Sequence, residues 1–453
     1  MSRRGFSAGL LALGPLLALS LAACAHYAPA PQHPERFAAT LDARRLEGAP
    51  ASGSWTGAEL LAQALVRNPQ VTEARAKYAT ALAAVRVART PAAPTLTLTA
   101  EYASQGPHWG YGGSGDFPLD FGTRRGSRVT TAELQALQAF YDLGEAAWSV
   151  RTDLEKARVA LTAADAEIGM ATQARDLRAE RAERVEARVA AGQDARAVAL
   201  LALGERATAE RRLAEAGGRR EAAITDLAKA LGVSAPAMRD LKLATVPGAS
   251  SLSELPAWRR DAASSRRDIL RAVADYDLAE AALRLEIANQ YPKVSLGPGY
   301  TYDHGVTKLP FSLSLALPGY DLNRGAIALA ETTRAQAGRS LELAQANALA
   351  AVDRAAVALA TARNGLERAR TRDLPLAEKT ADGVARSVRA GATDRVDDLA
   401  ARGAVLDARL NVLDAERALA LATADLEDAL RRSFDPAETA VLQAATAKAG
   451  GMR

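Results

Sequence analysis

The strongest constraint on the fold is an internal duplication. Landmarks in the first half of the chain recur in the second half at an offset of 198 or 199 residues. The matched pairs are Gly126 and Gly325, Gly192 and Gly391, Pro94 and Pro292, and the segments 226–231 ("DLAKAL") and 425–430 ("DLEDAL"). A constant offset over so much of the chain indicates two copies of one unit, and that unit is too long for a solenoid repeat.

Both copies show the same order of elements. Hydrophobic periodicity predicts a helix, two alternating strands, a long helix and a further helix in each copy. In the first copy we expect helices over about 57–90, 123–190 and 194–231, and strands over 95–103 and 116–122 joined by a Gly-rich loop, 104–115. In the second copy we expect helices over about 256–289, 323–389 and 393–432, and strands over 293–302 and 309–318. Thr56 and Glu59 form a capping box that starts the first helix.

The strands carry a pattern typical of membrane-facing β-structure. Apolar and small polar residues alternate strictly in "TLTLTAEYA" (95–103) and in "FSLSLAL" (311–317). Outer-membrane barrels show this alternation in strands of about 9–11 residues, with apolar residues toward lipid. Since four strands are too few to close a barrel, the chain must oligomerise. Two copies would supply eight strands and three would supply twelve. An ordinary half-buried hairpin is the alternative interpretation.

Composition argues against several functional classes. The formal net charge is only +4, and acidic and basic residues are interspersed, which is not typical of nucleic-acid binding. The four histidines, at 26, 33, 108 and 304, lack metal-ligand spacing, and no phosphate loop or nucleophile motif is present. We therefore expect no enzyme activity, no cofactor and no metal site. The two long helices, each about 67 residues, are too long for an ordinary globular domain.

The N-terminus predicts export and lipidation. Arg3 and Arg4 precede a short apolar run, 8–21, as in a secretory signal peptide. Cys24, the only cysteine, ends the sequence "LAAC", which resembles a bacterial lipobox. We expect residues 1–23 to be a signal peptide and Cys24 to carry lipid, with 24–54 as a lipidated, loosely ordered leader. A small buried cysteine near a cleavage site is the alternative.

Four segments resemble the TolC family of outer membrane factors. They are "ALVRNPQVTEA" (64–74), the "DFGTRRGS" that joins strand to helix, "LPGYDLNRGAIALAE" (317–331) and "RAGATDRVDDLAA" (389–401). The resemblance covers about residues 55–432. It implies a mainly α protomer with transmembrane β-strands, built as a duplicated helix–β-hairpin–helix–helix unit. It also implies a homotrimer with a twelve-stranded barrel in the outer membrane above a helical periplasmic barrel.

The resemblance also implies partners and a role. Such channels are passive exit ducts in tripartite efflux systems, with a periplasmic adaptor protein and an inner-membrane pump, here of the resistance-nodulation-division type. "LPGYDLNRG" resembles the CzcC-like subgroup that exports heavy-metal cations. Export of drugs and other organic compounds is the first alternative. A lipid-anchored periplasmic coiled-coil adaptor without a pore is the second.

The turns between the long helices are the candidate gate. In the family these turns form a periplasmic tip that closes the duct and docks the adaptor. Gly192 and Gly391 suit the chain reversals, and Asp194 and Asp394 stand where helix caps are expected. Asp397 matches an aspartate that lines the constriction. The family's second constriction aspartate falls on Ala400 here, and Asp398 is the alternative residue for that role.

These interpretations divide the chain into five parts. They are the signal peptide (1–23), the leader (24–54), the first repeat (55–245), the second repeat (246–432) and a C-terminal tail (433–453).

Overall fold

The structure is a computed structural model, and it describes most of the chain. The described residues are 27–48, 50, 53–105, 108–119, 123–239, 241–244, 254–303, 305–317 and 319–450. Cys24 and the predicted signal peptide lie outside the described residues, as does His304. The chain forms two units, one ending at Arg44 and the other beginning at Arg45.

The first unit contains a short helix within the predicted leader. A 3₁₀ turn, η1 (Pro34–Arg36), leads into α2 (Phe37–Ala43). Neither element has a buried residue. The expectation of a loosely ordered leader therefore missed this helix, whose "FAATLDA" sequence carries good helix formers.

The second unit begins with two helices where one had been predicted. These are α3 (Gly57–Arg67), which starts at the predicted Thr56–Glu59 capping box, and α4 (Pro69–Arg89). The break falls at Asn68 because a residue before proline is disfavoured in the helical conformation. The Asn68 side chain accepts from Gln70 N (2.8 Å) and so caps α4.

The second repeat breaks at the equivalent place. The predicted helix over 256–289 is divided into α7 (Leu255–Ala262) and α8 (Arg267–Ala288). Arg266 precedes α8 as Asn68 precedes α4, and both side chains are buried. Asn68 donates to the Ala230 carbonyl and Arg266 to the Ala429 carbonyl, 199 residues further on. The two repeats therefore make the same connection with different side chains.

Long helices follow the strands in both repeats. The first repeat has α5 (Thr123–Ala190), α6 (Arg196–Leu231) and the short η2 (Ala235–Met238). The second has α9 (Arg324–Arg368), the π-helical turn η3 (Ala369–Asp373), α10 (Leu374–Arg389) and α11 (Arg395–Leu430). The π turn precedes Pro375, whose ring and missing N–H a regular α-helix does not accommodate.

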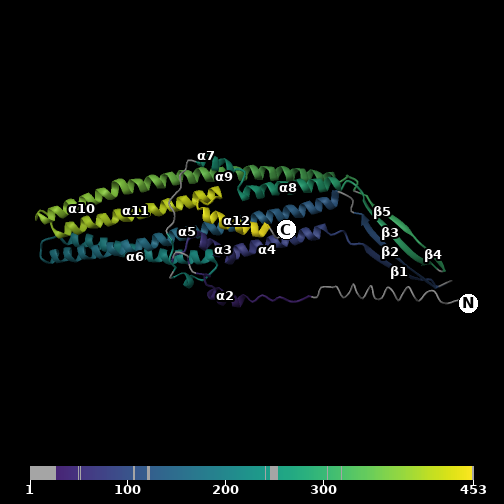
Figure 1. Ribbon diagram of the computed structural model, residues 1–453, viewed down its shortest axis with the longest axis horizontal. Coiled ribbons are helices and arrows are strands. Elements are labelled where there is room, and N and C mark those ends of the chain that lie inside the picture. The colour runs from purple at the N-terminus through teal and green to yellow at the C-terminus, as the bar shows by residue number, and fades with distance from the viewer. Residues whose placement is uncertain are drawn as a thin grey trace. The chain divides into compact units, whose positions relative to one another are not determined.

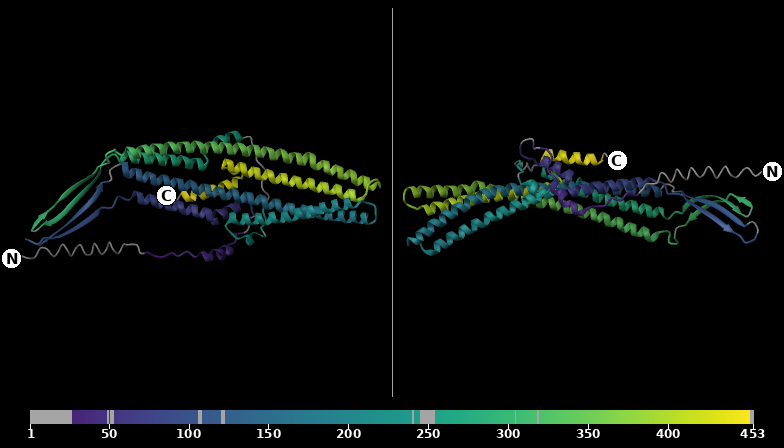
Figure 2. Two further views of the ribbon diagram at one scale, coloured as in Figure 1. Left: turned by 180° about the vertical axis from the view of Figure 1, so that it is seen from behind. Right: turned by 90° about the horizontal axis from the view of Figure 1, so that it is seen from below.

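The strands form one antiparallel sheet. Its members are β1 (Thr95–Tyr102), β2 (Trp109–Leu119), β3 (Lys293–Asp303), β4 (Val306–Lys308) and β5 (Phe311–Ala316). The order is β1-β2-β3, and β4 and β5 both pair with the other side of β3. The repeats therefore join through β2 and β3. Figures 1 and 2 show this sheet at one end of α4, α5, α8 and α9.

The Gly-rich segment predicted as a loop is part of β2. That strand begins at Trp109 and runs through Gly112 and Gly113. A Cβ on Gly112 would lie 3.0 Å from Thr99 Oγ1 and 3.1 Å from Thr301 Oγ1 on the two flanking strands. Glycine at position 112 is therefore explained by the close packing of the two flanking strands. Pro310 also separates β4 from β5, so the strand predicted over 309–318 starts at Phe311.

The predicted tail contains a helix that belongs to the core. This helix, α12 (Pro436–Gly450), packs on α3 and α5. Arg151 of α5 donates to Glu438 (Nε–Oε2, 2.8 Å) and to Glu427 (Nη2–Oε2, 2.7 Å), and all three side chains are buried. The largest apolar core is formed partly by the same three helices, α3, α5 and α12. It includes Leu60, Leu61, Leu154, Ile224, Leu227 and Leu442.

None of the described helices is both long and apolar enough to cross a membrane.

Candidate functional site

One face of the sheet is continuous and apolar. The strand register places the apolar residues of all the long strands on one side. The large ones are Leu96, Leu98, Tyr102, Trp109, Tyr111, Phe117, Leu119, Val294, Leu296, Tyr300, Tyr302, Phe311, Leu313 and Leu315. Many remain exposed, for example Leu98 at 76% and Phe311 at 70%. Exposed apolar surface of this extent in a single chain marks contact with lipid or protein.

The opposite face is small and polar. It carries threonine, serine and glycine, with Glu101, Asp116, Lys293, Asp303 and Lys308 as its charged members. The alternation predicted for the strands is therefore confirmed and extends across the sheet. Aromatic residues gather on the apolar face toward the hairpin turns, where Tyr111 and Tyr302 stack at 5.0 Å between ring centroids.

Both edges of the sheet lack a partner strand among the described residues. β1 pairs only with β2, and β5 pairs only with β3. Their outer N–H and C=O groups therefore form an open edge on each side, and such edges recruit further strands.

The turns at the other end of the helices have matching geometry. Gly192 (φ +71°) follows α5 and Gly391 (φ +72°) follows α10, both in the left-handed conformation predicted for them. Gln193 N donates to Arg188 O, and Ala392 N donates to Ser387 O, each at 2.9 Å. These bonds close a Schellman motif in each turn. Figure 1 shows both turns at the end remote from the sheet.

Arg188 connects the two turns. Its Nη2 donates to Asp194 Oδ1 (2.9 Å), and its Nη1 forms an ion pair with Asp394 Oδ2. Asp394 also caps α11, because its Oδ1 accepts from Val396 N (2.8 Å) and Asp397 N (3.1 Å). Asp194 does not cap α6, whose N-cap is Ala195 without a side-chain bond. The predicted cap at Asp194 is thus replaced by an ion pair.

Asp397 and Asp398 have different environments. Asp397 is exposed on the first turn of α11. Asp398 is 3% exposed and forms ion pairs with Arg395 Nη1 (2.8 Å) and Arg402 Nη2 (3.0 Å). Within one chain, only the first of these two carboxylates faces solvent.

Further ion pairs join the first-repeat helices to α11 behind the turns. Arg178 of α5 donates to both carboxylate oxygens of Asp407 (2.6 and 2.7 Å). Arg212 of α6 donates to Asp414 (3.0 Å) and to Glu167 (3.1 Å). These arginines therefore connect helices of the first repeat to a helix of the second. The sequence also gave no signal for Arg188, because its partners lie six residues ahead and in the other repeat.

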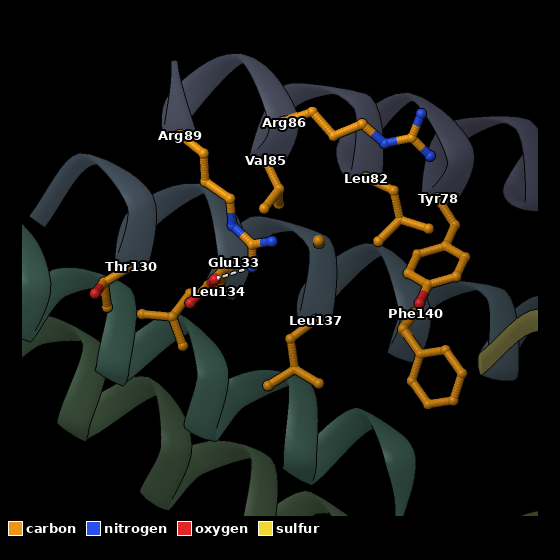
Figure 3. Close-up of a pocket in the computed structure, with 11 residues that line it drawn as sticks. Tyr78, Leu82, Val85, Arg86, Arg89, Thr130, Glu133, Leu134, Leu137 and Phe140 are labelled. Atoms are coloured by element: carbon orange, nitrogen blue, oxygen red, sulfur yellow. Dashed lines mark hydrogen bonds and ion pairs between the residues drawn. The ribbon is translucent and has the colours of Figure 1, made fainter. Parts of the chain in front are cut away.

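A groove lies between α4 and α5 (Figure 3). Its cavity measures about 450 Å³. Tyr78, Leu82 and Val85 line it from α4, and Leu134, Leu137 and Phe140 line it from α5. Arg89 Nη2 donates to Glu133 Oε1 (2.7 Å) at one side. The groove is thus apolar with a charged rim.

Within the described part of the chain, no group of three or more His, Cys, Asp or Glu side chains is placed to hold a metal ion.

Comparison with known proteins identifies a family. The sequence matches the outer membrane efflux protein family over two segments, residues 60–233 and 258–430. Each matched segment falls within one of the two predicted repeats. No curated protein matches the sequence.

Solved structures share the fold at low identity. A membrane protein from Pseudomonas aeruginosa superposes with a TM-score of 0.71 at 19% identity, covering 86% of this chain and 92% of its own. CusC gives a TM-score of 0.70 at 18% identity, with 90% and 99% covered. The outer membrane protein VceC from Vibrio cholerae gives 0.69 at 18% identity, with 84% and 97% covered.

Proposed function

Because the chain belongs to the outer membrane efflux protein family, we propose that it is the outer-membrane exit duct of a tripartite efflux system. The observation that carries this proposal is the two-faced sheet with open edges above long paired helices. An apolar face toward lipid and a small polar face toward a lumen are what a channel wall requires. The chain would act by passage and gating, without catalysis.

The duplication supports a cyclic assembly. Within one chain, α5 of the first repeat packs on α8 of the second, and β2 pairs with β3. The duplication implies two equivalent contacts, one between α9 and α4 and one between the second hairpin and β1. Within the described part of one chain, α9 does not pack against α4 and the second hairpin does not pair with β1. A neighbouring copy can supply both. We propose a homotrimer, which supplies twelve strands and leaves room for a lumen.

Surfaces suited to that contact are present on both repeats. The groove between α4 and α5 is apolar and open (Figure 3). On α9, Leu329, Leu343 and Val357 are 69%, 62% and 67% exposed and stand at intervals of fourteen residues. Such spacing keeps them on one side of a supercoiled helix. We propose that α9 of one copy packs against α4 of the next.

The paired turns would form the periplasmic tip. A ring of three exposed Asp397 carboxylates would attract cations at the narrowest point. Asp398 already has two arginine partners, which favours a gate with one aspartate ring. The glycine turns at 192 and 391 would dock a periplasmic adaptor, which would connect the duct to an inner-membrane pump of the resistance-nodulation-division type.

We propose heavy-metal cations as the substrate class on the strength of the "LPGYDLNRG" resemblance alone. In the structure, Asn323 of this segment donates to Glu286 O (2.8 Å) and Glu286 Oε2 (2.7 Å). These bonds tie the start of α9 to the end of α8, so they give the segment a structural role. Growth of a deletion strain with zinc, cobalt, cadmium, nickel, copper and silver, beside organic drugs and dyes, tests the substrate. Selective loss of metal tolerance supports the proposal, and selective drug sensitivity favours organic compounds.

We further propose that Cys24 anchors the chain to the outer membrane through lipid. The support is its position after an apolar signal and its uniqueness in the sequence. Labelled palmitate should be incorporated into the wild-type protein but not into Cys24→Ser. Equal incorporation by both would exclude Cys24 as the lipid site.

Conductance in a planar bilayer tests the channel itself. The purified chain should insert and give discrete conductance steps. A lipid-anchored adaptor without a pore would give none.

A further inference from the structure

A second cavity lies where α7, α8, α11 and α12 meet α5. We call it the second-junction cavity, and its volume is about 300 Å³. Four arginines line it, Arg266, Arg267, Arg431 and Arg432, against two carboxylates, Glu145 and Asp261. Trp148 and Trp258 supply aromatic walls. This size and mixture of polar and aromatic groups is typical of a small-molecule site.

The fold does not require these arginines. The first repeat builds the same junction with uncharged residues at the four equivalent positions, 198 or 199 residues earlier. Asn68, Pro69, Gly232 and Val233 stand there for Arg266, Arg267, Arg431 and Arg432. Asn68 and Arg266 even donate to equivalent carbonyls. The positive charge is therefore an addition confined to the second repeat.

Position 431 illustrates the difference. Gly232 is left-handed (φ +70°), and a Cβ there would lie 2.7 Å from Arg67 O, so this junction is closed. Arg431 keeps the same backbone conformation (φ +52°), which is unfavourable for a residue with a side chain. Its Nε donates to Glu145 Oε2 (3.1 Å). An arginine thus stands where the backbone favours glycine.

Two of the arginines have no carboxylate partner among the described residues. Arg267 lies over Gly144 and donates once, to the Gly144 carbonyl (3.1 Å). Burial lowers the pKa of Arg267, against the opposing effect of Glu145. Arg432 stands 5.2 Å from the Trp258 ring centroid. Arg266, by contrast, forms an ion pair with Asp268. Arg431 forms ion pairs with Glu145 and Asp428.

The two carboxylates beside the cavity differ in their access to it. Glu145 Oε1 is buried and has no hydrogen-bond partner, while Oε2 accepts from Arg431. The Oε1 atom has almost no accessible surface, so a ligand in the cavity cannot reach it, whereas Asp261 lines the cavity and is exposed. The available groups are therefore guanidinium donors and one carboxylate acceptor.

We propose that the second-junction cavity binds a small zwitterion of amino-acid or dipeptide size. Its carboxylate would bind Arg267 and Arg432, and its ammonium group would donate to the Asp261 carboxylate. Arginine pairs well with carboxylates because its planar fork matches their geometry. This site is independent of the transport proposal.

Calorimetric titration of the full chain in detergent with alanyl-glutamate tests the proposal, with acetate and inorganic phosphate as comparison ligands. We expect saturable binding of the dipeptide that weakens about tenfold or more in Arg267→Gln and in Arg432→Gln, since each loses a charge-assisted hydrogen bond. Arg354→Gln is the control, because Arg354 is exposed on α9 and bonds only its own helix. Circular dichroism and the elution volume confirm that each variant is folded.

Two results would overturn the proposal. The first is the absence of saturable binding to wild type at millimolar dipeptide, or equal binding by wild type and both variants. The second is phosphate or acetate binding as tightly as the dipeptide, which would contradict the role of Asp261.

Discussion

Arg188 of the first repeat forms an ion pair with Asp394 of the second, and the same guanidinium binds Asp194. One side chain therefore holds both tip turns of a chain together. Opening of the tip would have to break or rearrange this contact. The pair is partly exposed, so salt should weaken it.

We predict that Arg188→Gln raises the single-channel conductance, because the two helical hairpins are no longer tied. The difference from wild type should shrink between 0.1 and 1 M KCl, as the Debye length falls from about 10 Å to about 3 Å. Arg184→Gln is the matched control, since Arg184 pairs only with Glu180 in its own helix (3.0 Å). Equal conductance of wild type and Arg188→Gln would show that this ion pair does not restrict the tip.

Asp397 and Asp398 should behave differently when neutralised. Asp397→Asn should weaken block by divalent cations with little effect on stability, because Asp397 is exposed. Asp398→Asn should lower the stability of the tip by about 1–3 kcal/mol, because it removes a buried charged acceptor from two arginines. Bilayer recordings and thermal unfolding measure the two effects. Unchanged cation block in Asp397→Asn would remove Asp397 from the gate.

The buried network around Arg151 gives a prediction for stability. Arg151→Gln should destabilise the chain by about 3–5 kcal/mol, because Glu427 and Glu438 would remain buried without a cation. The effect is measured by thermal unfolding at pH 7. A deficit below about 1 kcal/mol would mean that the network is not formed.

The same variant has an expected pH dependence. Burial raises the pKa of Glu427 even beside Arg151, and loss of Arg151 should raise it further. A carboxyl whose folded pKa is raised favours folding in its protonated form, so that contribution is lost as pH rises through the folded pKa. The deficit of Arg151→Gln should therefore shrink as pH falls from 7 toward 5. A deficit that grows over this range would contradict the account.

The contact between copies can be tested on α9. Leu343→Glu should weaken the oligomer without unfolding the chain, because Leu343 is exposed in a single copy. Ala358→Glu, also exposed but about a quarter-turn from the Leu329–Val357 line, is the control. Light scattering after chromatography gives the mass. An unchanged mass for Leu343→Glu would place the interface elsewhere.

Elements that depend on local periodicity could be predicted from the sequence. Features that depend on tertiary contacts could not. The long helices, the glycine turns and the two-faced strands follow from local patterns, and the structure has them. Glycines in β2 were assigned to a loop because their close strand neighbours are far away in sequence. Asn68 and Pro69 could have predicted the helix break. The break at Arg266 has no proline signal and follows only from the duplication.

The candidate site was predictable in part. Gly192, Gly391 and the cap at Asp394 follow from turn and cap preferences. The role of Arg188 and the burial of Asp398 depend on how two hairpins pack, which no local pattern contains. The helix α12 was missed because its sequence is weakly amphipathic and its position depends on Arg151 and Glu438, 287 residues apart.

The exposure of the β1–β2 turn on intact cells tests the central claim most directly. The variants Ser104→Cys and Gln193→Cys place a thiol beside the hairpin turn and in the helix turn at the opposite end. A membrane-impermeant maleimide added to whole cells should label Ser104→Cys and leave Gln193→Cys unlabelled until the outer membrane is opened. Protection of both positions in intact cells would contradict an outer-membrane duct and support a periplasmic scaffold.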